Sequence, residues 1–219
     1  MQNELLNQWL LQQKELFGDT LYVSGINTEP KQDDYSSLDQ FRKEIKDCQN
    51  CSLGESRTHF VFGVGNPDAD LVFVGEAPGK NEDLQGEPFV GRAGKLLDKI
   101  LQAIGLDRTK VYILNVLKCR PPKNRDPAPI EVEKCEPYLI TQLNIIKPKL
   151  IVALGRVAAN TLLKLDLPLG KMRNRLFIYE GIDLIATYHP AALLRNPNLK
   201  KAAWEDFKHI RDNYLTGQA

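Results

Sequence analysis

The sequence predicts an α/β fold in which helices cover both faces of a mainly parallel sheet. Short runs that are apolar at every position, such as residues 69–74 and 150–154, alternate with segments of helical periodicity. Strands that are apolar on both sides are typical of parallel sheets buried between two layers of helices. The chain has 219 residues, 42% of them hydrophobic and 26% charged, which suffices for one domain with a full core.

The elements before the sheet form a separate region. Residues 4–17 have the pattern of an amphipathic helix, and a segment rich in Gly, Pro, Asp and Ser follows them. We therefore divide the chain into an N-terminal helical extension with its linker, residues 1–36, and a main domain, residues 37–219. A short helix is expected over residues 38–47, with Ser37 as its N-cap.

Strands and helices alternate through the main domain. We expect strands at 69–74, 111–116 and 150–154, followed by a hairpin that pairs 176–179 with 184–187 around Glu180 and Gly181. Helices are expected at 91–105, 130–146, 155–165 and 202–214.

Polar motifs stand where three of these strands end. Gly75-Glu76-Ala77-Pro78-Gly79 follows the first strand, Asn115 closes the second, and His189 follows the last. Ligands bind beyond the carboxyl ends of strands in such sheets, so a carboxylate, a carboxamide and an imidazole are expected in one cleft. Taken singly, each residue has a structural alternative, such as a strand-to-helix turn for the glycine motif. This motif matches neither G-x-G-x-x-G nor a P-loop.

Four cysteines predict a metal centre. Cys48 and Cys51 form a C-x2-C turn, while Cys119 and Cys135 flank a Pro-rich loop with fifteen residues between them. Thiolates at this spacing can bind zinc or an iron–sulfur cluster. Disulfides are the alternative and require an oxidising compartment. The N-terminus lacks signal-peptide features and no apolar run has membrane-spanning length, so we expect a cytoplasmic protein without membrane contact and favour the metal.

The net charge of +1 provides no global field that would attract nucleic acid. A nucleic-acid partner would depend on local clusters, and two segments are candidates: KCRPPKNR, residues 118–125, and LLRNPNLKK, residues 193–201. On charge alone, both are better interpreted as solvated loops.

Three segments form a specific combination with the cysteine spacing: GEAPGKNEDLQGEPFVGRAGKLLD, ILNVLKCRPPKNRDP and TYHPAALLR. Together they resemble the type-4 uracil-DNA glycosylases, the iron–sulfur members of their superfamily. The resemblance covers about residues 40–215. It implies a three-layer α/β/α sandwich around a mainly parallel four-stranded sheet. It also implies a DNA repair hydrolase that flips uracil out of single- or double-stranded DNA and cleaves its N-glycosidic bond, leaving an abasic site.

The resemblance also assigns residues to roles. The catalytic residues would be Glu76 and His189. Substrate would be bound by Gly75, Glu82 near uracil C5, Phe89 stacking on uracil, Asn115 reading the base, and Asn124 near the catalytic water. DNA would be bound by Leu193, Leu194 and Arg195, and a [4Fe-4S] cluster, with zinc as the alternative, by Cys48, Cys51, Cys119 and Cys135.

The chemistry of these side chains is consistent with the implied reaction. A carboxamide at Asn115 can donate to uracil O4 and accept from N3–H, whereas cytosine presents the reverse pattern. An N–H of His189 would stabilise the anionic leaving uracil. Glu76 would either stabilise the sugar cation or orient water. Phosphates would be held by basic residues of the two loops, namely Lys118, Arg120, Lys123, Arg125, Arg195, Lys200 and Lys201.

Hydrolysis of a glycosidic bond consumes no electrons, so the cluster is expected to be structural. We expect a monomer whose residues 1–36 dock on the domain or recruit a replication or repair partner. A non-catalytic uracil- or DNA-binding module on the same scaffold is the alternative function.

Overall fold

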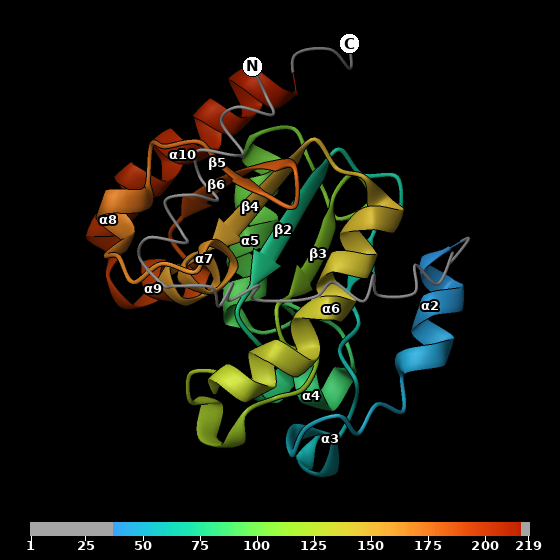
Figure 1. Cartoon of the computed structure of the whole chain (residues 1–219). Helices are drawn as coiled ribbons and strands as arrows, with labels where there is room; N and C mark the ends of the chain where they lie inside the picture. The colour runs from blue at the N-terminus through green and yellow to red at the C-terminus, as the bar shows by residue number, and fades with distance from the viewer. Residues whose placement is uncertain (1–36, 216–219) are drawn as a thin grey trace, which may run out of the picture. The chain divides into compact units, whose positions relative to one another are not determined.

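The computed structural model describes residues 37–215, in which a single six-stranded sheet is packed between helices (Figure 1). The predicted helix at 4–17 and the roles proposed for residues 1–36 lie outside the described residues. The strands are β1 Val64–Gly65, β2 Leu71–Gly75, β3 Tyr112–Asn115, β4 Leu150–Leu154, β5 Phe177–Tyr179 and β6 Ile182–Thr187.

The sheet has the order β1-β3-β2-β4-β6-β5. Its four central strands are parallel, and the short edge strands β1 and β5 pair antiparallel to β3 and β6. The expected four-stranded parallel sheet is thus present as the centre of a larger one. Val64–Gly65 was missed because two residues carry no readable periodicity, and β5 was assigned correctly as one strand of the hairpin with β6.

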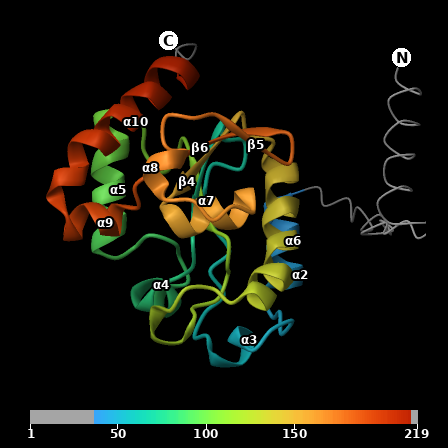
Figure 2. The same ribbon diagram turned by 60° about the vertical axis from the view of Figure 1, so that its left-hand side comes forward.

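Two apolar cores form because alternate residues of each central strand face opposite sides. Val72 and Val74 of β2 face one core, and Leu71 and Phe73 face the other. The first core is covered by α2 Leu38–Ile45, α6 Pro129–Ile146, α7 Arg156–Leu163 and α8 Leu169–Met172. The second core is covered by α5 Arg92–Ala103 and α10 Lys200–Tyr214. Figure 2 shows α5 and α10 on one side of the sheet and α6 with α2 on the other, which confirms the three-layer prediction.

Short helices fill the connections at the carboxyl edge of the sheet. These are α3 Leu53–Ser56, α4 Lys80–Gln85, the 3₁₀ segments Pro122–Asn124 and Pro197–Leu199, and α9 Pro190–Arg195. The sequence analysis did not predict them, because pieces of three to six residues are too short to show a helical period. The side chain of Ser37 accepts a hydrogen bond from Gln40 N at 3.2 Å, which confirms it as the N-cap of α2.

The chain order places the end of β2 at a switch in connectivity. The chain leaves β2, crosses through α4 and α5 to β3 on one side, and then crosses through α6 to β4 on the other side. Crevices for ligands form where successive connections diverge in this way. The segment that follows β2 therefore lies where a binding site is expected. Within residues 37–215, no helix is both long and apolar enough to cross a membrane.

Candidate active site

The end of β2 brings Gly75, Asn115 and Phe89 into contact. Gly75 pairs with Asn115 in the parallel register of β2 and β3. A Cβ on Gly75 would lie 2.3 Å from Asn115 Oδ1 and 2.8 Å from the Phe89 ring. Only glycine therefore permits both side chains to pack over this strand end. Asn115 is 2% exposed, and no hydrogen bond of its carboxamide to another described residue is present.

Phe89 occupies a strained turn that other residues hold in place. Its φ of 55° lies in the left-handed region, which is unfavourable for a bulky side chain. Arg108 donates hydrogen bonds to the carbonyl oxygens of Phe89 and Pro88, and Arg108 Nε donates to Asp98 Oδ1 at 2.7 Å. A Cβ on Gly94 would overlap the Phe89 carbonyl, so α5 also packs directly against this turn.

Glu82 supports the same turn from the other side. Its Oε1 accepts hydrogen bonds from Val90 N and Gly91 N, both at 3.1 Å. These two N–H groups lie at the start of α5, where they have no partner within the helix. Glu82 thus contacts the main chain of the two residues that follow Phe89. Its predicted place near uracil C5 stays a prediction.

His189 contacts Phe89, and its Nε2 makes no hydrogen bond to another described residue. The two rings stack with centroids 5.4 Å apart and an interplanar angle of 30°. His189 Nδ1 accepts a hydrogen bond from Ala191 N at 3.1 Å, so the neutral ring carries its proton on Nε2. Burial, and then the charge of Arg195, lower the pKa of His189 to about 4, while Glu82 opposes this. The imidazole is therefore a neutral Nε2–H donor at pH 7.

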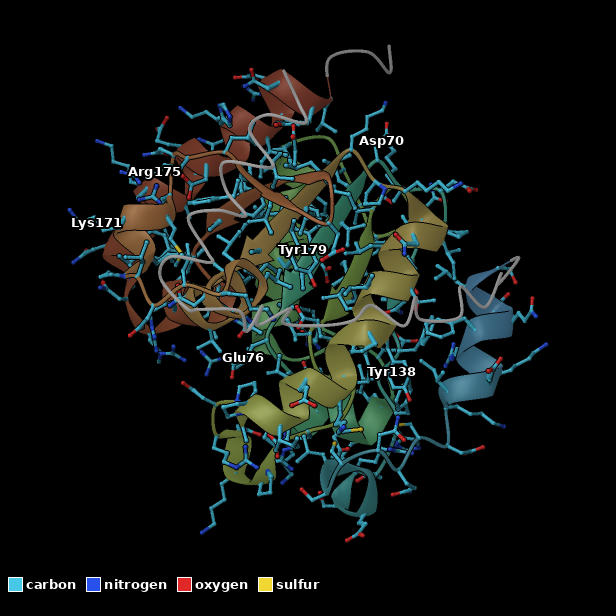
Figure 3. The ribbon with its side chains drawn as sticks, viewed as in Figure 1. Asp70, Glu76, Tyr138, Lys171, Arg175 and Tyr179 are labelled. Carbon is cyan, nitrogen blue, oxygen red and sulfur yellow. The ribbon has the colours of Figure 1, made fainter. Side chains whose placement is uncertain are left out.

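Glu76 lies just beyond β2 and is half-buried (Figure 3). Burial, and then the negative charge of Asp126, raise the pKa of Glu76 to about 7, whereas Arg156 lowers it. Asp126 belongs to the Pro-rich loop, and Arg156 begins α7; their closest N–O distance is 4.0 Å. Burial is thus the main cause of the raised pKa of Glu76, and the two charges that modify it belong to residues that the sequence analysis did not select.

The Pro-rich loop has a fixed conformation. Lys123 and Asn124 both have positive φ, and Asn124 Oδ1 accepts a hydrogen bond from Arg120 Nε at 2.7 Å. Arg125 binds both oxygens of Glu131, at 2.9 and 2.5 Å, and Glu131 also accepts from Ala128 N. Three residues of this loop border solvent, as DNA contact requires: Arg120, Lys123 and Asn124. Arg125, which was also expected to hold phosphate, is instead paired with the carboxylate of Glu131.

The prediction that Lys118 contacts phosphate is wrong, because its side chain is completely buried.

The DNA-binding residues predicted on α9, the helix after His189, also need one correction. Leu193 was predicted to bind DNA, but it is 2% exposed and part of the packed interior, so it is not placed to contact DNA. Leu194 and Arg195 are exposed and remain candidates for that role.

The four cysteines line one small cavity between the C-x2-C turn, the end of the β3 segment and α6. All four are free thiols, and Cys119 and Cys135 are buried. Among residues 37–215, no three Cys, His, Asp or Glu side chains are placed so as to share a single metal ion. The four cysteine side chains thus surround one cavity, but they are not arranged to bind a single metal ion.

Hydrogen-bond donors point at the sulfur atoms of this cavity. Arg57 Nη1 donates to Cys119 Sγ at 3.4 Å and to the carbonyl oxygen of Cys48. Tyr138 Oη, on α6 (Figure 3), donates to Cys48 Sγ at 3.2 Å, and burial raises the pKa of this phenol. Lys118 N donates to Cys135 Sγ at 3.3 Å. Donors of this kind stabilise thiolates rather than neutral thiols.

The model of the uracil DNA glycosylase superfamily matches residues 62–208, which include all of the strand-end residues described above. The chain belongs to this superfamily. It is 52% identical over 182 residues to a type-4 uracil-DNA glycosylase of Archaeoglobus fulgidus, a match that covers 80% of this chain and 92% of the relative. A type-4 uracil-DNA glycosylase of Sulfurisphaera tokodaii is 47% identical, over 82% of this chain and 86% of the relative. Another, of Saccharolobus solfataricus, is 43% identical, over 83% of this chain and 93% of the relative. The predicted resemblance to the type-4 branch is confirmed.

Several residues of the site were missed from the sequence. Gly155 and Arg156 directly follow β4, much as Glu76 directly follows β2, and a Cβ on Gly155 would lie 2.9 Å from His189 Cβ. The strand-end rule, applied to all four parallel strands, would have found them. Arg108 had no such signal, because its contact with Phe89 depends on the tertiary packing of α5.

Proposed function

We propose that this chain excises uracil from DNA by hydrolysing the bond between the base and deoxyribose. The observation that carries the proposal is the meeting of Asn115, Phe89 and His189 around the end of β2, in a member of the uracil-DNA glycosylase superfamily. Its most similar relatives named above are uracil-DNA glycosylases. A base inside a duplex is out of reach of side chains buried as deeply as Asn115 and Phe89, so the reaction requires the nucleotide to be flipped out of the helix.

Base selection is assigned to Asn115. Its buried carboxamide can donate to uracil O4 and accept from N3–H, and the two bonds together match uracil but not cytosine. An incorrect base would leave the amide unpaired in a site that excludes water, which is costly. The ring of Phe89 provides an apolar surface beside Asn115 on which the flipped base can stack.

His189 and Glu76 are assigned to the bond-breaking step. As the glycosidic bond breaks, the electron pair stays on uracil and positive charge develops on the sugar. The neutral His189 Nε2–H can donate to uracil O2 as this charge appears, and it needs no change of protonation. An ionised Glu76 would stabilise the sugar cation or orient the water that attacks C1′.

DNA contact is assigned to the exposed end of α9. Leu194 is the residue of this helix placed to fill the gap left by a flipped base, and Arg195 to contact a phosphate. Asn124 with Arg120 and Lys123 forms a second exposed edge on the Pro-rich loop. We propose that the protein acts on DNA as a monomer in the cytoplasm.

We further propose that Cys48, Cys51, Cys119 and Cys135 hold a [4Fe-4S] cluster. Each thiolate of such a cluster binds its own iron atom, so the four sulfurs need only enclose a common cavity. The donors on Arg57 and Tyr138 and the positive charge of Lys118 are consistent with four thiolates. When bound, the cluster cross-links three segments that share no secondary structure.

The proposed function is tested by incubating the purified full-length chain with uracil-containing oligonucleotides, without added metal or nucleotide. Free uracil should appear, and alkali should cleave the strand at the former uracil position. A chain that binds both single- and double-stranded uracil DNA but releases no uracil would be the non-catalytic binding module. Matched oligonucleotides with thymine or cytosine in place of uracil are the controls.

A further inference from the structure

Lys118 is a buried cation that takes no part in the proposed bond cleavage or in DNA contact. It is among the largest completely buried side chains of residues 37–215. Its Nζ donates a hydrogen bond to the main-chain carbonyl of Asn115 at 2.8 Å, and its main-chain N–H donates to Cys135 Sγ at 3.3 Å. One residue therefore contacts both the strand end that reads the base and the cavity of the cysteines.

The charge of Lys118 lacks a carboxylate partner. Among the described residues, no Asp or Glu oxygen lies within 4.0 Å of its ammonium group. Burial of an unpaired charge is strongly unfavourable, so buried lysines are normally paired. If Lys118 served only to fill space, an apolar side chain of similar length, such as methionine, would be favoured. The position of the charge therefore requires a physical explanation.

The cysteine cavity provides the missing counter-charge. Four thiolates around a 2+ iron–sulfur core leave two negative charges in the interior of the protein. Two cationic residues adjoin these cysteines. Lys118 precedes Cys119 and donates its main-chain N–H to Cys135 Sγ, with its buried ammonium close enough to interact electrostatically with both sulfurs, and the guanidinium of Arg57 donates to Cys119 Sγ. The two positive charges balance the centre without any carboxylate.

We propose that Lys118 is a positioning residue that links the cysteine centre to Asn115. Its ammonium supplies counter-charge to the centre and, with the same group, holds the main chain of Asn115 in the orientation needed to read the base. The inference rests on the proposed cluster. It implies that assembly of the cysteine centre also fixes the position of Asn115 at the end of β3. The charge of Lys118, in addition to packing, would transmit this effect.

The test compares Lys118→Met with Lys134→Met in the full-length, cluster-loaded protein. Lys134 is a matched control because it lines the same cavity, but its side chain is 47% exposed and pairs with Glu133. Three quantities are measured: the reduction potential of the cluster, the rate of single-turnover uracil excision, and the dissociation constant for uracil-containing DNA. Loss of a buried positive charge makes reduction harder, so Lys118→Met should lower the potential clearly more than Lys134→Met does.

Excision by Lys118→Met should slow by about 10- to 100-fold, the usual effect of losing a residue that orients a metal ligand or its surroundings. DNA affinity should change little, because Lys118 is buried away from DNA. If Lys118→Met does not fold, Lys118→Gln, which removes the charge but keeps a polar group, serves for the same comparison. An unchanged potential and excision rate, or equal effects of the two methionine variants, would overturn the inference. A wild-type protein that contains no iron would instead refute the proposed cofactor, and the inference with it.

Discussion

The rings of Phe89 and His189 stack on each other, with centroids 5.4 Å apart, although the two residues are one hundred positions apart in the chain. The residue proposed to stack on uracil and the residue proposed to stabilise its negative charge therefore form one surface. Phe89 is held by the main-chain contacts of Arg108 and Glu82, and His189 by its position at the start of α9. A change in the turn around Phe89 is thus expected to affect both binding of the base and cleavage.

Replacement of Arg108 tests the importance of this turn. Arg108→Ala removes the donors to the carbonyls of Pro88 and Phe89, and the left-handed conformation of Phe89 should then relax. Excision should slow by about 10-fold or more, because small displacements of a positioned group are costly in catalysis. Single-turnover kinetics measure this effect. The control is Arg211→Ala, which removes an exposed ion pair with Asp212 and should leave the rate within about twofold.

The assignment of base reading to Asn115 is tested by Asn115→Asp. A carboxylate cannot donate to uracil O4 and repels the developing negative charge, so uracil excision should fall by about 10²-fold or more. Only the protonated acid could admit cytosine. Excision rates on uracil- and cytosine-containing oligonucleotides provide the measurement. If uracil kinetics were unchanged, Asn115 would not be the residue that reads the base.

The pH dependence of excision tests the role of Glu76. Its pKa of about 7 leaves it protonated in acid and ionised in base. If the ionised form supports catalysis, the rate should rise with pH to a midpoint near 7 and then level off. Asp126→Asn removes a negative charge that raises this pKa, so its midpoint should move to lower pH; Arg156→Gln should move it higher. In Glu76→Gln the rise of the rate with pH should disappear. If the pH profile of this variant were unaltered, the titrating group would be a residue other than Glu76.

The parallel sheet and the strand-end residues could be predicted because both leave clear patterns in the sequence. Fully apolar runs separated by amphipathic helices indicate a parallel sheet, and this placed Glu76, Asn115 and His189 at one edge of it. The environment of these residues could not be predicted in the same way. The contact of Arg108 with Phe89 and the effect of Asp126 on Glu76 join segments whose distance is set only by packing.

Lys118 illustrates the same limit. In the sequence it stands within a basic loop segment and was assigned to DNA, yet the structure buries it beneath Asn115. Composition alone cannot distinguish a lysine that faces solvent from one whose ammonium is buried against a main-chain carbonyl. Leu193 was misassigned for a related reason, because α9 turns this leucine inward and Leu194 outward.

The proposed metal centre is tested by Cys119→Ser. Loss of this ligand should lower iron and acid-labile sulfide content, and the midpoint of thermal unfolding should fall with it by roughly 5 °C or more. Ser52→Ala is a suitable control, because Ser52 adjoins Cys51 but makes no capping hydrogen bond to α3. Metal analysis of anaerobically purified protein provides the measurement. Zinc in place of iron, or full iron content in Cys119→Ser, would contradict the assignment.

The most direct test of the account compares excision with binding in His189→Ala. The His189 Nε2–H should matter mainly when charge develops on uracil, so single-turnover excision should fall by about 10²-fold or more. Affinity for uracil-containing DNA should change much less, whereas Arg195→Ala should weaken affinity and its dependence on salt. Equal loss of rate and affinity in His189→Ala would make the histidine a ground-state binding residue. An unchanged rate would show that the reaction takes place elsewhere than in the cleft at the end of β2.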